Sequence, residues 1–161
     1  MPTAFMEGHD RRHATKAVAA MSDAKSILLI DDNHKDRQYY AQQLKLNSPD
    51  YVIFEALTGQ AGLDLCHSQS IDCVILELGL PDMSGFEVLT NLIPIPRQPK
   101  IPVVVLTGFF NQSLLKVAKM EGAFATLQKG TTSGDDLGKV VHEAIATIPV
   151  DAHSYRYFDH A

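Results

Sequence analysis

Residues 74–85 have the sequence VILELGLPDMSG, which indicates the class of fold more directly than any other stretch of the chain. It joins an apolar run to one acidic residue, Glu77, and then to a loop that contains Pro81 and Gly85. Continuous apolarity over so few residues is typical of a strand buried on both faces, as in a parallel sheet covered by helices. The stretch therefore predicts a central strand that ends in a carboxylate.

Four further short apolar runs flank this one along the chain. They are residues 27–30, 51–54, 103–106 and a weaker run at 124–127, and the central one begins at Cys73. Helical stretches separate them, so the pattern predicts five strand–helix units and an α/β domain. The runs at 27–30, 73–76 and 103–106 are apolar throughout, so we expect them to be the central strands.

Two of the helical stretches have a clear apolar face. Residues 33–46 place Tyr40, Ala41 and Leu44 on one side. The last helix carries the clearest stripe in the chain, which consists of Leu137, Val140, Val141, Ala144, Ile145 and Ile148. Such spacing is typical of a helix that packs against a core, and core packing is the role we expect for these side chains.

Length and composition indicate one globular domain with two short appendages. The chain has 161 residues, of which 45% are hydrophobic, and a net charge of −5. We expect a leader at residues 1–25, a domain at 26–148 and an aromatic-rich tail at 149–161. The acidic balance argues against nucleic acid or an anionic membrane as partner, and no apolar run reaches transmembrane length. Two cysteines without metal-finger spacing fit a cytosolic protein.

Polar side chains stand where each long apolar run ends. In a doubly wound parallel sheet, the carboxyl ends of the strands converge on one crevice, so these groups should meet there. Three carboxylates, a hydroxyl and an ammonium suit a divalent cation and a phosphoryl group. Singly, each is more often a helix cap or a surface charge, but the ordered set is hard to explain that way. The groups are Asp31, Asp32, Glu77, Thr107 with Gly108, and Gln128 with Lys129.

Together these motifs resemble the receiver domain of bacterial two-component response regulators. The resemblance covers about residues 25–147 and is carried by ILLIDDN (27–33), VILELGLPDMSG (74–85), VVVLTG (103–108) and LQKG (127–130). It implies a flavodoxin-like, doubly wound, five-stranded parallel sheet flanked by five helices. It also implies a cytoplasmic signalling role without enzymatic activity, with a histidine kinase or phosphotransfer protein and a downstream protein target as partners. Homodimerisation remains open.

The resemblance assigns a role to each site residue. Asp32 would ligate Mg²⁺ directly and Asp31 largely through water, while the Gly79 carbonyl would supply another ligand. Thr107 would hydrogen-bond a phosphoryl oxygen and Lys129 would pair with it. Glu77 occupies the phosphoacceptor position, which also belongs to the metal set, and Gly108 leaves room for the phosphoryl group.

Three positions depart from the family pattern. Glu77 stands where the phosphoacceptor aspartate belongs, and its additional methylene extends the carboxylate towards Thr107 and Lys129. Thr126 stands where an aromatic switch residue is usual, and Gly130 replaces the common proline. Because Thr126 has no ring to move between buried and exposed states, it cannot give the usual aromatic response to phosphorylation. Phe124 could substitute in part, although core packing is the role we expect for it.

These departures favour a pseudo-receiver in which Glu77 pairs with Lys129 and fixes one conformation without phosphorylation; such pairing would weaken Mg²⁺ binding. A second hypothesis is a receiver that still takes phosphate, either at Glu77 or at an aspartate that engineering has replaced. A third, from another class, is a metal-dependent phosphatase or phosphotransferase. The loops are short for that chemistry, and the chain has no P-loop or GxGxxG motif.

Overall fold

The computed structural model describes residues 24–109 and 111–149. Most of the expected leader and nearly all of the expected tail lie outside these residues. The strands are β1 (Ser26–Ile30), β2 (Val52–Ala56), β3 (Cys73–Leu76), β4 (Val103–Thr107) and β5 (Ala125–Gln128). The helices are α2 (His34–Asn47), α3 (Gly59–Ser68), α4 (Gly85–Leu92), α5 (Gln112–Met120) and α6 (Gly134–Ala146).

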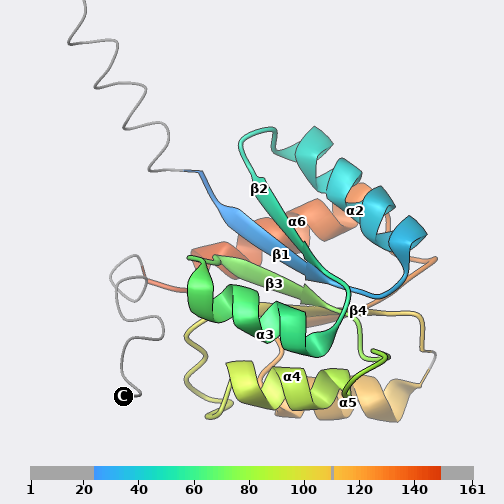
Figure 1. Cartoon of the computed structure of the whole chain (residues 1–161), viewed down its shortest axis with the longest axis vertical. Coiled ribbons are helices and arrows are strands. Elements are labelled where there is room, and N and C mark those ends of the chain that lie inside the picture. The colour runs from blue at the N-terminus through green and yellow to red at the C-terminus, as the bar shows by residue number, and fades with distance from the viewer. Residues whose placement is uncertain (1–23, 110, 150–161) are drawn as a thin grey trace, which may run out of the picture.

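The five strands form one parallel sheet in the order β2-β1-β3-β4-β5, which is the flavodoxin-like doubly wound topology. Figure 1 shows the strands side by side with helices in front of and behind them. The sheet confirms the predicted fold class and the central place of β1, β3 and β4. Every residue of β3 and β4 is buried, which explains their continuous apolarity.

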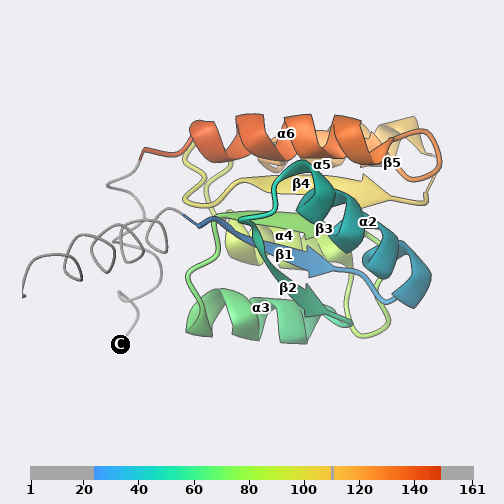
Figure 2. The same cartoon turned by 90° about the horizontal axis from the view of Figure 1, so that it is seen from above.

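Helices cover both faces of the sheet, so the core has two layers (Figure 2). On one face α3 and α4 pack on alternate residues of the central strands, among them Leu28, Val74 and Val105. On the other face α2 and α6 pack on the intervening residues, such as Leu29 and Ile75. Alternate side chains of a strand point to opposite faces, so each central strand contributes to both layers.

Element boundaries differ slightly from the expected ones. The edge strands β2 and β5 each begin one residue later than predicted, and Phe124 precedes β5 while packing in the core. Helix α6 ends at Ala146, so Ile148 lies beyond it, although its side chain is buried. The other stripe residues of α6 are buried or half-buried, as expected. No helix within residues 24–109 and 111–149 is long and apolar enough to cross a membrane.

Candidate functional site

The predicted site residues do stand at the carboxyl edge of the sheet. Asp31 directly follows β1 and Glu77 directly follows β3, while Thr107 is the last residue of β4 and Lys129 directly follows β5. The parallel register aligns these strand ends, since Ile30 pairs with Leu76 and Thr107 pairs with Gln128. The topology therefore gathers groups that are far apart in sequence, as Asp31 and Lys129 are.

Lys129 is the centre of the cluster. Its Nζ atom lies 2.6 Å from Oδ2 of Asp31, 2.9 Å from Oε2 of Glu77 and 3.0 Å from Oδ2 of Asp36. The lysine side chain is only 13% exposed, and the Asp31 and Glu77 side chains are 8% exposed. One ammonium group thus pairs with three carboxylates. Its positive charge offsets the repulsion between the two buried ones, Asp31 and Glu77.

The Glu77 carboxylate is fully engaged by hydrogen-bond donors. Its Oε1 atom accepts from the Thr107 hydroxyl at 2.5 Å, and also from the backbone N–H groups of Leu78 at 2.7 Å and Gly79 at 3.1 Å. Its Oε2 atom accepts from the backbone N–H of Gly108 at 3.2 Å, in addition to the Lys129 ion pair. The longer side chain of glutamate therefore reaches the hydroxyl, the amide and the ammonium at once.

The surroundings shift the pKa values of the cluster. Burial alone would raise the pKa of Glu77, but hydrogen bonds from Thr107 and Lys129 outweigh it and hold the pKa below its ordinary value. Burial alone would lower the pKa of Lys129, but its hydrogen bonds to Asp31, Glu77 and Asp36 raise the pKa above its ordinary value. Burial raises the pKa of Asp31, against the opposing effect of Lys129. The Glu77–Lys129 pair is therefore ionised at neutral pH.

Local contacts fix the turn after β1. The carboxylate of Asp31 accepts from the backbone N–H of Asn33 at 2.8 Å, and Asn33 itself caps α2. The carbonyl of Asp31 accepts from the buried guanidinium of Arg37 at 2.8 Å, and Arg37 also pairs with Glu55 of β2 at 3.0 Å. The side chain of the adjacent Asp32 is exposed, unlike that of Asp31.

In the loop after β3, the backbone at Gly85 lies very close to the backbone of Glu77 and Leu78. A Cβ atom on Gly85 would lie 2.5 Å from the Leu78 Cα atom and 2.6 Å from the Glu77 carbonyl oxygen, so only glycine fits there. Ser84 caps α4 in a capping box with Glu87, and Asp82 accepts from the N-terminal N–H groups of α3. The loop is thus anchored to two helices beside Glu77.

Two residues of this site, Asp36 and Arg37, were not among those predicted from the sequence. Both lie in the first turns of α2, which begins three residues after Asp31. An acidic residue in the first turn of the helix that follows β1 was a usable signal for Asp36, because that turn borders the same crevice. Arg37 gave no such signal, since arginine in a helix is usually exposed.

The donor set does not fit a divalent cation in the arrangement that the structure shows. Both oxygens of Glu77 already accept two or more hydrogen bonds or ion pairs, and Asp31 is bound to Lys129 and Asn33. Across residues 24–109 and 111–149, no group of three or more His, Cys, Asp or Glu side chains is arranged to hold a metal ion. A cation would have to compete with the Lys129 ammonium for these oxygens.

Together, the doubly wound sheet and the cluster of carboxylates, hydroxyl and lysine at its carboxyl edge define a receiver-type signalling module. A family model, the response regulator receiver domain, matches residues 27–142, and the chain belongs to this family. It is therefore the receiver domain of a two-component response regulator.

Comparison with individual proteins agrees with this assignment. The cell cycle response regulator CtrA of Brucella ovis is 35% identical over 82 residues, which are 51% of this chain and 34% of CtrA. A response regulator receiver domain protein from Clostridium thermocellum superposes with a TM-score of 0.67 at 28% identity, over 76% of this chain and 95% of that one. The Mn²⁺-bound form of response regulator Rcp1 superposes with a TM-score of 0.62 at 26% identity, over 73% of this chain and 90% of Rcp1. The chain spans about a third of the length of CtrA, which is 34% covered by the match.

Proposed function

We propose that this receiver is a pseudo-receiver, which acts by protein–protein interaction in a conformation that does not depend on phosphorylation. The main support is that hydrogen-bond donors and an ammonium group surround the Glu77 carboxylate. The resemblance assigns the Thr107 hydroxyl, the Lys129 ammonium and the space beside Gly108 to a phosphoryl group. In this chain the first two groups and the Gly108 N–H are already bonded to the Glu77 carboxylate.

Charge supports the same proposal. The ionised Glu77 carboxylate brings its negative charge to the donors that would otherwise neutralise a phosphoryl group. A phosphoryl group that arrived at Glu77 would have to displace the Thr107, Gly108 and Lys129 contacts together, without gaining new donors for the oxygens it added. The resident network therefore opposes phosphorylation and at the same time imitates the contacts that phosphorylation would make.

Divalent cation binding should be weak for the same reason. The Mn²⁺-bound Rcp1 structure shows a response regulator with a bound cation, and Asp31, Asp32, Glu77 and the Gly79 carbonyl are the positions that the resemblance assigns to Mg²⁺. Two of these carboxylates already pair with Lys129. A cation bound at this site would supply positive charge that the lysine already supplies.

We propose partners of the kind that the resemblance implies, a histidine kinase or phosphotransfer protein and a downstream protein target, in the cytoplasm. Exposed apolar side chains of α5 and of the loop before it offer the contact surface: Met120 is 76% exposed, Phe109 51% and Val117 43%. Leu115 on the same helix is half-buried. Exposed apolar side chains on a water-soluble domain mark interaction sites when they are clustered. We expect neither nucleic acid nor membrane as a partner of this domain.

A second function, a receiver that still takes phosphate, is favoured by one observation. Asp31, Asp32, Thr107 and Lys129 are all present and three of them lie in the cluster, so only the acceptor departs from the family set at the site itself. Under this hypothesis phosphate attaches to Glu77, or to an aspartate that an engineered substitution removed. The metal-dependent phosphatase hypothesis has no comparable support, and we propose that the chain is not an enzyme.

Phosphoryl uptake separates the two functions. The parent protein and the Glu77→Asp variant would be incubated with Mg²⁺ and a small acyl-phosphate donor, and their intact masses measured over time. We expect the parent to gain no mass and the variant to gain one phosphoryl group, because shortening the side chain frees the donors that stabilise the transferring group. Rapid uptake by the parent would overturn the pseudo-receiver proposal. No uptake by the variant, beside a control receiver that does label, would mean that the crevice has lost more than its acceptor.

A further inference from the structure

The Glu77 carboxylate holds two loops at once. Its Oε1 atom accepts from the N–H groups of Leu78 and Gly79, the first residues of the loop after β3. Its Oε2 atom accepts from the N–H of Gly108, the first residue of the loop after β4. The Thr107 hydroxyl adds a further bond to this carboxylate at 2.5 Å. The Glu77 carboxylate therefore links the two loops directly.

Phe109 bridges the same two loops. Its N–H donates to the Thr107 hydroxyl oxygen at 3.2 Å, so its backbone belongs to the network around Glu77. Its ring lies against Gly79: a Cβ atom on Gly79 would be 2.5 Å from the Phe109 Cε2 atom and 2.9 Å from Cζ. The ring thus fills the space that a side chain at position 79 would need.

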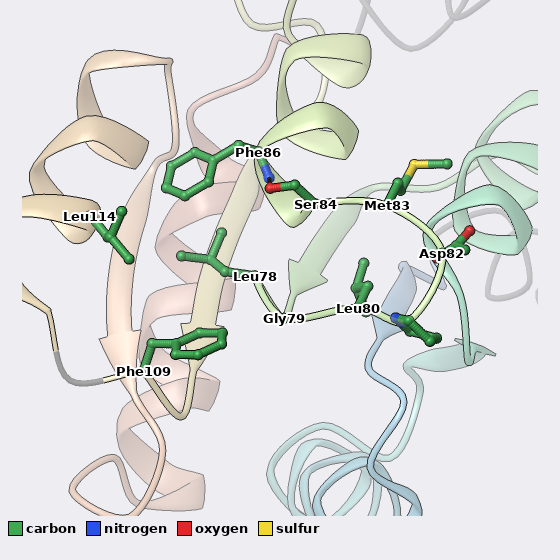
Figure 3. A pocket seen from close by; sticks show the side chains of 10 residues that line it. Leu78, Gly79, Leu80, Asp82, Met83, Ser84, Phe86, Phe109 and Leu114 are labelled. Carbon is green, nitrogen blue, oxygen red and sulfur yellow. Dashed lines mark hydrogen bonds between the residues drawn. The ribbon is translucent and has the colours of Figure 1, made fainter.

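The ring also forms one wall of a shallow apolar hollow. Figure 3 shows Phe109 beside Gly79 and facing the region between Leu78, Phe86 and Leu114. The hollow has a volume of about 380 Å³ and lies between the loop after β3 and the start of α5. Leu78 is buried below it, whereas Phe109 remains 51% exposed. A half-exposed ring in this place can move with little loss of core packing.

We propose that Phe109 is a positioning residue through which the resident Glu77 carboxylate shapes the apolar surface beside the site, in place of the aromatic switch that Thr126 cannot provide. While the carboxylate holds the N–H groups of Gly79 and Gly108, the ring stays packed on Gly79 and forms one wall of the hollow. When the carboxylate is removed, the two loops lose this shared anchor, the ring leaves Gly79 and the hollow loses that wall. This role rests on the proposed function, because it describes how the same site shapes a surface that a partner protein would contact.

The absence of tryptophan from the chain makes a direct test available. In Phe109→Trp the indole would be the single tryptophan, and its emission and acrylamide quenching would report its exposure. We expect Glu77→Ala in this background to shift the emission to the red and to increase quenching. Thr107→Val should shift it in the same direction to a smaller extent, because it removes only the Thr107 bonds. Tyr39→Trp, on the exposed side of α2, is the matched control, and its emission should not respond to Glu77→Ala.

A second variant, Gly79→Ala, tests the contact of the Phe109 ring with the loop after β3 while Glu77 is unchanged. Gly79→Ala places a methyl group where the Phe109 ring lies, so in the Phe109→Trp background it should shift the indole emission to the red with the carboxylate intact. Should Phe109→Trp fail to fold, the aromatic proton resonances of Phe109 itself would be compared with and without Glu77→Ala. Emission or resonances that stay unchanged in Glu77→Ala, whether or not Gly79→Ala shifts them, would overturn the inference. Phosphoryl uptake by the parent would refute the pseudo-receiver proposal but leave this result standing.

Discussion

At the scale of single residues, the charge balance around Lys129 determines the properties of the site. Three carboxylates lie within 3.0 Å of its Nζ atom, two from the end of β1 and the start of α2 and one from the end of β3. The pairing of Lys129 with Glu77 could be predicted from the ends of the strands, because parallel strands bring their carboxyl ends together. The position of Asp36 in the first turn of α2 indicated that it borders the crevice, but its contact with Lys129 also depends on how α2 is rotated about its axis.

Glu77→Gln should destabilise the fold at neutral pH by roughly 1–3 kcal/mol, since a neutral amide cannot accept all of the bonds that the buried carboxylate accepts. The folded pKa of Glu77 lies below its ordinary value of 4.5. The stabilisation is therefore fully present above that pH and is lost as the pH falls through the lower folded pKa. Urea unfolding from neutral pH into the acid range should show the difference between parent and variant shrinking at low pH. A difference that persists unchanged in acid, or that Glu143→Gln on the exposed side of α6 reproduces, would contradict this prediction.

Lys129→Met should lower the free energy of unfolding by more than any other single substitution in the cluster. It leaves two buried carboxylates, Asp31 and Glu77, close together without their cation, which typically costs about 3–5 kcal/mol. Thermal and urea unfolding would measure the loss, with Lys116→Met on an exposed position of α5 as the control. Equal stability of the two variants would show that Lys129 is not the cation that holds the cluster together.

At the scale of elements, the sequence predicted the strands better than the helices. Strands β1, β3 and β4 were predictable because both of their faces are buried, so every residue must be apolar. The edge strand β2 has exposed and half-buried positions, and its limits were accordingly less certain. Helices α3 and α4 are short and contain or begin with glycine. Their positions follow from close contacts, such as Gly62 against Ile30, that no periodicity reveals.

The capping box of α4 ties this element to the loop that follows Glu77. Ser84 accepts from the backbone N–H of Phe86, and the Glu87 carboxylate accepts from the Ser84 N–H at 3.1 Å. Ser84→Ala should therefore lower the free energy of unfolding by about 1 kcal/mol, as is usual for loss of an N-cap side chain. Urea denaturation would measure it, and Ser113→Ala within the first turn of α5 provides a control that removes no cap. Equal losses in the two variants would argue against the capping role.

At the scale of the whole molecule, the sheet, the two helical layers and the site form one system. The buried strands fix where their carboxyl ends lie, and those ends carry the groups that meet at Lys129. The family membership and this arrangement were both predictable from the sequence, because the motifs stand in the right order along the chain. The full engagement of Glu77 by five donors was not, because it depends on backbone N–H groups whose directions only the folded loops define.

The most direct test of the central claim, that Glu77 holds the site in one conformation without phosphorylation, follows the backbone amides that donate to it. The amide resonances of Leu78, Gly79 and Gly108 would be recorded by NMR with Mg²⁺ alone and again after a small acyl-phosphate donor is added. We predict that the donor changes none of the three resonances in the parent protein and shifts all three in Glu77→Asp. A shift of these resonances in the parent, reversed as the phosphoryl group is lost, would contradict the claim.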